Sequence, residues 1–276
     1  MPVVGTSIKF LATRVSPRLG DHLLRFTPRA LTDFTAFVEY RGLEVSVYTG
    51  EELGRRIYYK DQYEPVQEEA LLGLVRSGMR IFDVGANIGI YALQAARLGA
   101  TVVAFEPSRL VRHRLVRNIV ANRLTESITV VPEAVAAKQG TVEFFETRTG
   151  NWGVGRIFAY GHALRGGERY SVPTDSLDNL ALRFGTPDLI KMDIEGAEYL
   201  AVQGATTLFS SPTAPLLMIE FHPDEIVALG GTLDATTGVL QESGYRRSCI
   251  RGCRDGSHSW LLFSRFEVSS PAFSAC

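Results

Sequence analysis

Cysteine is scarce in this chain of 276 residues, which has only Cys249, Cys253 and Cys276. An odd number of cysteines gathered near one end is not a disulfide framework, and it favours structural thiols in a reducing compartment. Cys249 and Cys253 precede His258, but no second ligand pair accompanies them, so we do not interpret them as a metal site. The sequence therefore excludes a small protein that depends on disulfides for its fold.

Long hydrophobic runs and an excess of charge of one sign are also missing. No apolar stretch approaches the roughly 18 residues that span a bilayer, and we identify no secretory leader with a cleavage site. The 29 basic and 30 acidic residues leave a net charge of −1, so no overall field attracts nucleic acid or an anionic membrane. These absences predict a cytoplasmic protein whose partner is small or locally recognised.

The chain does contain enough hydrophobic residues, 45%, for one large domain with an added segment. The first thirty or so residues are short amphipathic pieces broken by Pro17 and Pro28. Residues 36–40 and 43–48 then predict a hairpin. We interpret residues 1–62 as an N-terminal cap of helices and a hairpin, and residues 63–276 as the main domain. The cap is expected to pack on the domain or to form a homodimer contact rather than to insert into a membrane.

From residue 79 onwards, apolar strands alternate with helical patterns, which is typical of a doubly wound α/β domain. Strands are expected at 80–83, 101–105, 128–132, 189–193 and 216–220, and helices at 66–75, 88–98, 108–122 and 198–208. The polar stretch 138–172 predicts one strand, 141–145, followed by a long glycine-rich loop. The segments 244–245 and 260–263 predict a closing strand pair.

A glycine turn, D-V-G-A-N-I-G at 83–89, follows the first of these strands, and Glu106 ends the next strand. A strand, a glycine turn and an acidic strand end about twenty residues later predict a nucleotide-cofactor site. Asn87 stands where a dinucleotide fingerprint has its second glycine, so close approach to a pyrophosphate is not provided. Asp83 would repel a phosphate but attract a sulfonium or amino group. The turn therefore favours S-adenosylmethionine over NAD, with helix N–H groups for its carboxylate and Glu106 for its ribose hydroxyls.

Three motifs together resemble the FkbM-family methyltransferases: D-V-G-A-N-I-G-I-Y at 83–91, A-F-E-P at 104–107 and K-M-D-I-E-G-A-E at 191–198. The resemblance spans roughly residues 63–220. It implies the class I, Rossmann-like α/β fold, with a seven-stranded, mostly parallel sheet, helices on both faces and an antiparallel last strand. It also implies transfer of a methyl group from S-adenosylmethionine to a hydroxyl of a sugar, glycan or secondary metabolite, with S-adenosylhomocysteine as product.

The candidate cofactor-binding residues combine the glycine turn, the acidic strand ends and the resemblance. They are Tyr63, Glu64, Asp83, Gly85, Ala86, Asn87, Gly89, Glu106, Pro107, Ala134 and Asp193. Helix capping is the alternative for Asp83 and Glu106, but the glycine turn and the spacing agree on cofactor binding.

Methyl transfer to an alcohol requires alignment and removal of a proton, so a base or a metal is expected near the methyl group. Asp193 is the first candidate for orienting or deprotonating the acceptor, followed by Glu195, Glu220 and His222. These four residues could instead gather a hard divalent cation. That metal site is an alternative, and the sequence does not predict it. A satisfied structural histidine is the alternative for His222.

The polar loop supplies Asn151, Trp152 and Tyr160 as candidate walls of an acceptor pocket, with packing of the loop as the alternative. We interpret the arginines of 108–122 as a solvated helix face, so nucleic acid is not an expected partner. The competing functions are an N-methyltransferase, an NAD-dependent oxidoreductase and a non-catalytic cofactor-binding scaffold subunit. The D-I-E-G sequence at 193–196 argues against the scaffold.

Overall fold

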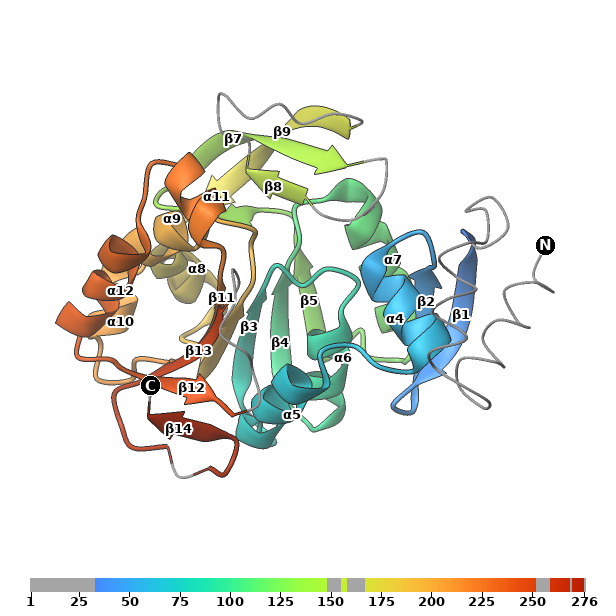
Figure 1. Cartoon of the computed structure of the whole chain (residues 1–276), viewed down its shortest axis with the longest axis horizontal. Coiled ribbons are helices and arrows are strands. Elements are labelled where there is room, and N and C mark those ends of the chain that lie inside the picture. The colour runs from blue at the N-terminus through green and yellow to red at the C-terminus, as the bar shows by residue number, and fades with distance from the viewer. Residues whose placement is uncertain (1–32, 148–154, 158–166, 252–258, 269, 276) are drawn as a thin grey trace.

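The computed structural model describes residues 33–147, 155–157, 167–251, 259–268 and 270–275. A mixed sheet of eight strands forms its centre (Figure 1). These strands are β3 (Arg80–Val84), β4 (Thr101–Phe105), β5 (Ile128–Val131), β10 (Leu189–Met192), β11 (Leu216–Phe221), β12 (Arg246–Ile250), β13 (Ser259–Ser264) and β14 (Phe273–Ala275). Across the sheet their order is β14-β12-β13-β11-β10-β3-β4-β5.

The chain enters this sheet at its centre and winds outwards in both directions. It runs from β3 through β4 to β5, and then returns to place β10 on the other side of β3. Strands β5, β4, β3, β10 and β11 are mutually parallel, whereas β13 is antiparallel to β11 and to β12. The doubly wound α/β fold is thus confirmed. The expected seven strands are eight, because β14 adds to the outer edge of β12.

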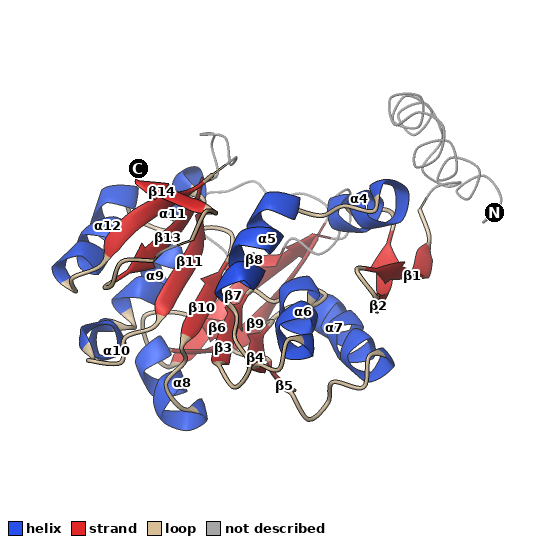
Figure 2. Cartoon of the chain, turned by 90° about the horizontal axis from the view of Figure 1, so that it is seen from below, coloured by secondary structure: helices blue, strands red, loops and turns tan. Residues whose placement is uncertain are grey.

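Helices cover both faces of the sheet (Figure 2). One face carries α5 (Pro65–Leu74), α6 (Ile90–Arg97) and α7 (Arg109–Ala121), and the other carries α8 (Leu177–Phe184), α9 (Glu198–Gln203), α10 (Thr206–Ser210) and α12 (Leu233–Glu242). Alternation along β3 explains how one strand serves both layers, since Ile81 belongs to the first core and Phe82 to the second. Burial on both faces is also why these strands are almost continuously apolar.

Three predicted helices are confirmed as α5, α6 and α7, but the predicted helix 198–208 is interrupted. It divides into α9 and α10 at Gly204. The backbone of Gly204 lies against the residues just after β6 (Ala134–Val135), so that a Cβ on Gly204 would be 2.4 Å from the carbonyl oxygen of Ala136. The helices α4 (Glu52–Lys60), α8, α11 (Pro223–Ala228) and α12 were not predicted.

A second, four-stranded sheet replaces much of the long loop expected at 138–172. It contains β6, β7 (Gly140–Thr147), β8 (Gly155–Ile157) and β9 (Gly167–Asp175), in the order β6-β9-β7-β8. Its small core includes Phe144, Ile157 and Val172. The predicted strand 141–145 is confirmed as β7. The sequence did not reveal β6, β8 and β9, because few of their residues are apolar and an alternating pattern is therefore hard to detect.

The N-terminal hairpin is confirmed as β1 (Thr35–Tyr40) and β2 (Leu43–Tyr48), joined at Arg41 and Gly42. Both turn residues have positive φ, as a two-residue hairpin requires. The hairpin packs on α7, where the backbone N–H of Ser46 donates to Oδ1 of Asn118 at 2.7 Å. Residues 1–32 of the expected cap lie outside the described residues, and the boundary at residue 62 stays a prediction.

One of the three cysteines is not the structural thiol that the sequence led us to expect. Cys249 is disulfide-bonded, so the expectation of unpaired structural thiols is wrong for this residue. Cys253, His258 and Cys276 lie outside the described residues.

The helices agree with the lack of long hydrophobic runs in the sequence. In the part of the chain that the structure describes, none of the helices has the length and apolar character needed to traverse a bilayer.

Candidate active site

A cavity lies over the carboxyl ends of β3, β4, β5 and β10, and the second sheet closes its other side. It encloses about 600 Å³ of space, including solvent at its mouth. The cavity is lined by Val84, Gly85, Asn87, Phe105, Glu106, Pro107, Glu133, Ala134, Val135, Phe144, Gly155, Arg156, Ile157, Asp193, Ile194, Glu195 and Ala197. It therefore lies beside the point where the chain reverses its direction across the sheet, which is where open α/β sheets bind ligands.

The glycine turn after β3 forms one wall of the cavity. Gly85 has φ +78°, and a Cβ there would lie 1.8 Å from the backbone oxygen of Asp193. Only glycine fits, because the turn both needs positive φ and touches the end of β10. The backbone N–H groups of Gly85 and Ala86 both donate to the carbonyl oxygen of Phe105 at 3.0 Å. The turn is thus fixed to its neighbouring strands before any ligand binds.

Glu106 is held beside this turn by two backbone groups. Its Oε2 accepts a hydrogen bond from the N–H of Asn87 at 2.9 Å, and its Oε1 accepts one from the N–H of Ser108 at 2.8 Å. Burial raises the pKa of Glu106 to about 7, although these two hydrogen bonds lower it. Because a carboxylate has about four lone-pair sites, acceptor capacity remains for a ligand in the cavity.

Asp83 lies away from the cavity, contrary to the direct contact with a cationic cofactor that the sequence suggested. Its side chain is only 1% exposed, and Oδ1 lies 3.3 Å from Nζ of Lys191. Burial raises the pKa of Asp83, while Lys191 lowers it. Nζ of Lys191 also donates to the carbonyl oxygen of Gly85 at 2.8 Å. Asp83 thus supports the glycine turn through Lys191.

Tyr63 and Glu64 also lie outside the cavity lining, close to its acidic end. Oε2 of Glu64 accepts a hydrogen bond from the hydroxyl of Tyr91 at 2.7 Å. Burial raises the pKa of Glu64 to about 7, and the charge of Asp193 adds to this increase. Burial raises the pKa of Tyr63 well above its ordinary value. Tyr63 and Glu64 therefore lie near Asp193 without lining the cavity.

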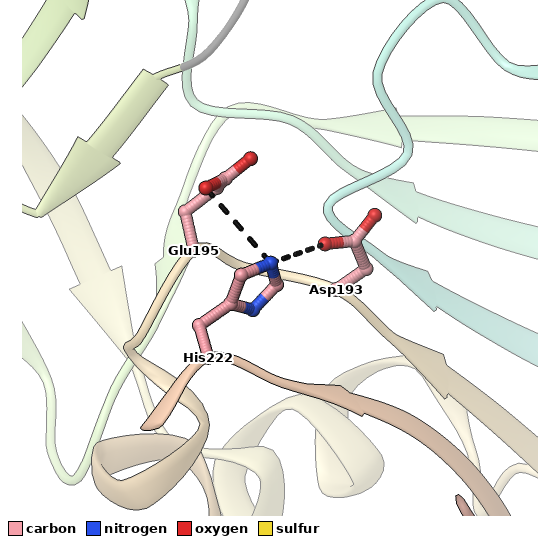
Figure 3. Close-up of side chains that lie close together, drawn as sticks. All are labelled: Asp193, Glu195 and His222. Atoms are coloured by element: carbon pink, nitrogen blue, oxygen red, sulfur yellow. Dashed lines mark ion pairs between the residues drawn. The ribbon is translucent and has the colours of Figure 1, made fainter. Parts of the chain in front are cut away.

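The acidic end of the cavity brings Asp193 and Glu195 against His222 (Figure 3). Nε2 of His222 lies 3.8 Å from Oδ1 of Asp193 and 3.9 Å from Oε2 of Glu195. On the other side of the ring, Nδ1 lies 3.0 Å from Oε1 of Glu198. His222 follows β11, whereas the three carboxylates belong to the segment after β10. Parallel strands thus bring residues that are far apart in sequence to one point.

Two residues of the turn at 193–196 have positive φ, and only one of them is a glycine. Gly196 has φ +101°, and a Cβ there would lie 2.3 Å from Cβ of Glu225. Glu195 also has positive φ, +53°, which is uncommon for a residue with a side chain. Oε1 of Glu198 accepts hydrogen bonds from the N–H groups of Ile194, at 3.3 Å, and Gly196, at 3.2 Å. Glu198 therefore holds both this turn and His222.

Crowded carboxylates dominate the electrostatics of this end. Burial lowers the pKa of His222, but the hydrogen bond with Glu198 and the charges of Asp193 and Glu195 outweigh it and raise the pKa to about 10. Burial and the charge of Asp193 raise the pKa of Glu195 to about 7. Burial and neighbouring carboxylates raise the pKa of Glu220 to about 9. The surroundings thus favour a positive charge at the position of His222.

The predicted site residues divide into three groups by their position relative to the cavity. Gly85, Asn87, Glu106, Pro107, Ala134, Asp193 and Glu195 line the cavity, and Tyr63, Glu64, Asp83, Ala86, Gly89, Glu220 and His222 lie outside its lining. The candidate acceptor residues Asn151, Trp152 and Tyr160 lie outside the described residues.

Sequence reasoning missed Lys191, Arg156 and Glu133. Lys191 stands inside the quoted K-M-D motif, and a lysine within an apolar strand was a signal that a buried carboxylate accompanies it. Arg156 lies on the unpredicted strand β8 and lines the cavity. Its Nη1 lies 3.5 Å from Oε1 of Glu225. Glu133 lines the cavity after β5 and pairs with Arg183 at 2.8 Å.

The fold, the glycine turn and the acidic strand end define a cofactor-binding α/β protein of the methyltransferase type. The sequence matches the family model of the methyltransferase FkbM domain over residues 83–247. Since the match covers more than half of the chain, this protein belongs to the FkbM methyltransferase-domain family.

Solved structures that match this chain share little sequence with it. The methyltransferase FkbM from Methylobacillus flagellatus is 19% identical, with a TM-score of 0.47, over 75% of this chain and 49% of that one. A putative rRNA-methylase from Clostridium thermocellum is 9% identical, with a TM-score of 0.45, over 71% and 91% of the two chains. The match thus spans about half the length of the Methylobacillus protein. None of the proteins with curated descriptions matches the sequence.

Proposed function

We propose that this protein is an S-adenosylmethionine-dependent O-methyltransferase that acts on a hydroxyl of a small-molecule acceptor, such as a sugar or a secondary metabolite. The observation that carries the proposal is one cavity with two unlike ends. The glycine turn and Glu106 form one end, and Asp193 and Glu195, with His222 packed behind them, form the other. A donor and an acceptor can therefore meet within a single pocket.

The residues at the first end fit this donor. The turn at Gly85 has no room for a Cβ, so the backbone itself forms the cavity wall. Glu106 retains acceptor capacity for ribose hydroxyls, and α6 begins at Ile90, directly after its N-cap residue Gly89. Asn87 occupies the position of the glycine that dinucleotide sites need for a pyrophosphate. These features favour S-adenosylmethionine over NAD.

When bound, S-adenosylmethionine supplies a methyl group that its sulfonium has already made electrophilic. The chain must then align the acceptor and accept its proton. Asp193 and Glu195 face the cavity and can orient a hydroxyl group. His222, with its raised pKa, already carries a proton at neutral pH, so it is poorly suited to accept another. The carboxylate of Asp193 is therefore the proposed proton acceptor.

The test of the donor site is calorimetric titration of the full chain with S-adenosylhomocysteine and, separately, with NADH. We expect micromolar binding of S-adenosylhomocysteine, weakened at least tenfold by Glu106→Ala, because charged hydrogen bonds to the ribose are lost. Glu133→Ala is the matched control, since this carboxylate lines the same cavity but pairs with Arg183. Binding of NADH alone, or of neither ligand, would refute the proposal.

The test of the acceptor end is transfer of a labelled methyl group from S-adenosylmethionine to a panel of hydroxylated and amino acceptors. Asp193→Asn should keep the affinity for S-adenosylhomocysteine and lose most of the turnover, because it removes the proton acceptor. An unchanged rate would remove Asp193 from the mechanism. Transfer only to amino acceptors would instead support an N-methyltransferase.

A further inference from the structure

We propose that Asp193, Glu195 and His222 bind a divalent metal ion at the edge of the cavity. The three residues supply two carboxylates and one imidazole, and one ligand atom from each lies within 4.8 Å of the others. The sequence offered this site only as an alternative, because its ligands follow two different strands, β10 and β11, which the fold places side by side. The role of the ion in catalysis rests on the proposed function, but its binding does not.

The spacing of the three side chains suits a shared ion better than direct hydrogen bonds. Nε2 of His222 lies 3.8 Å and 3.9 Å from the two carboxylates, which exceeds the length of a hydrogen bond. Metal–ligand bonds of about 2.0–2.2 Å place two ligands of one ion about 3 to 4 Å apart. The two distances from Nε2 of His222 fall within that range, and all three ligand atoms lie within 4.8 Å of one another. Figure 3 shows all three side chains converging on one point.

The orientation of His222 is fixed for coordination through Nε2. Its Nδ1 lies 3.0 Å from Oε1 of Glu198, whose side chain is fully buried. This contact assigns the Nδ1 proton to the hydrogen bond with the carboxylate, so an ion that displaces the Nε2 proton of His222 would bind the nitrogen that faces Asp193 and Glu195. A carboxylate behind a histidine is the arrangement that orients metal-ligating imidazoles in proteins. Glu198 is therefore a positioning residue.

The turn that carries the two carboxylates is held independently of any ligand. Glu198 accepts hydrogen bonds from the N–H groups of Ile194 and Gly196. The ligands thus do not need to be assembled from a mobile loop, which lowers the entropic cost of binding an ion. The ion would complete a structure that is already in place.

The position of the group on the cavity leaves room for other ligands of the ion. Asp193 and Glu195 line the cavity, while His222 lies behind them with a side chain only 4% exposed. Three protein ligands on one side leave positions open towards the cavity, as in metal sites that bind substrate. Two carboxylates and one imidazole suit Mn²⁺ or a similar divalent cation.

Such an ion would act on the acceptor hydroxyl in the proposed methyl transfer. Coordination would lower the pKa of a bound hydroxyl, so that its proton is released to water. The oxygen would then form a bond to the methyl carbon while the sulfur–methyl bond of the donor breaks and S-adenosylhomocysteine leaves. With the ion bound, Asp193 acts as a ligand of the ion, and its role as the proton acceptor applies to the site without the ion. The proposal thereby assigns the acceptor a hydroxyl, or a pair of neighbouring hydroxyls, that can coordinate a metal.

The experiment is a titration of the chelator-treated full chain with Mn²⁺, followed by loss of the electron paramagnetic resonance signal of the free ion. We expect one ion per chain with a dissociation constant below about 1 mM. Asp193→Asn and Glu195→Gln should weaken binding at least tenfold, and Glu198→Gln about tenfold to a hundredfold through His222. Asp224→Asn is the matched control, because this carboxylate is exposed and lies two residues from His222, outside the group.

Absence of binding, or equal binding by the wild type and the Asp193 and Glu195 variants, would overturn the proposal. Circular dichroism melts confirm that each variant is folded, and the partly exposed Asp193 carries the test if the Glu198 variant does not fold. Parallel calorimetry with S-adenosylhomocysteine separates the two proposals. Binding of Mn²⁺ without S-adenosylhomocysteine would keep the metal site and refute the methyltransferase role, whereas the reverse result would refute only the metal site.

Discussion

The two ends of the cavity are formed by different chemical groups, backbone at one end and side chains at the other. At the β3–β4 end, backbone groups dominate, since Gly85 forms the wall and both carboxylate oxygens of Glu106 accept backbone N–H groups. At the β10–β11 end, side chains dominate, and two carboxylates surround the imidazole of His222 at distances too long for hydrogen bonds. At the first end, Glu106 already has hydrogen-bond partners within the protein. At the second end, several carboxylates lie close together.

This difference indicates where each part of the reaction belongs. A wall made of backbone keeps its shape and suits a ligand that is the same in every turnover, which is the methyl donor. A cluster of carboxylates has unusual pKa values, and it is stabilised when a cation or a hydroxyl group binds to it. The proposed function therefore assigns the acceptor and its activation to the second end, and substitutions at each end can separate the two experimentally.

The largest effect is expected where the two ends touch. Gly85→Ala places a Cβ 1.8 Å from the backbone oxygen of Asp193, at a positive φ that alanine adopts poorly. Because neither backbone can move without displacing β3 or β10, the free energy of unfolding should fall by about 3–5 kcal/mol. Denaturant unfolding followed by circular dichroism measures the change.

Gly73→Ala in α5 is the control for that substitution, since nothing lies within 4 Å of its would-be Cβ. There the substitution should be neutral or stabilising by up to about 1 kcal/mol, as expected for alanine in a helix. If Gly85→Ala were no more destabilising than Gly73→Ala, the two ends would not be in contact as described.

The next largest effect should come from Lys191, which links the ends through its charge. Nζ of Lys191 lies 3.3 Å from Oδ1 of Asp83 and 3.8 Å from Oδ2 of Asp193. Lys191→Met leaves the buried carboxylate of Asp83 without its ion pair, and we expect a loss of about 3 kcal/mol in the free energy of unfolding. Urea unfolding at neutral pH measures it.

The double variant Asp83→Leu/Lys191→Met tests the reason for that loss. Removing both charges also removes the unpaired buried carboxylate, so at least half of the lost stability should return. A double variant as unstable as the sum of the two single ones would show that Lys191 acts on the fold through something other than Asp83.

The sequence predicted the backbone elements of the β3–β4 end because its signals are local, although Asp83 lies away from the cavity. A positive φ at Gly85, a helix start at Gly89 and a carboxylate at the next strand end all lie within one strand–helix–strand unit. The structure places Gly85, Asn87 and Glu106 on the cavity, as expected from that unit. The same local patterns predicted the central strands and the helices α5 to α7.

The β10–β11 end could be predicted only in part because its contacts are not local. The residue types at Asp193, Glu195 and His222 were recognised, but the contact of Glu198 with His222 joins different elements and has no sequence pattern. The ion pair of Asp83 with Lys191 likewise depends on the pairing of β3 with β10. Pairing between distant strands is set by the whole fold, so local periodicity does not reveal it.

The smallest effect tests whether Glu106 binds the donor as a carboxylate. Burial raises the pKa of Glu106 to about 7, so the group is increasingly protonated below that pH and loses the charge that accepts hydroxyl hydrogen bonds. Affinity for S-adenosylhomocysteine should therefore fall about tenfold between pH 8 and pH 6. Glu106→Gln should bind more weakly at pH 8 and change little with pH, because its amide does not titrate. Calorimetry at several pH values distinguishes the two, and an equal pH dependence in both proteins would assign the titration to the β10–β11 end instead.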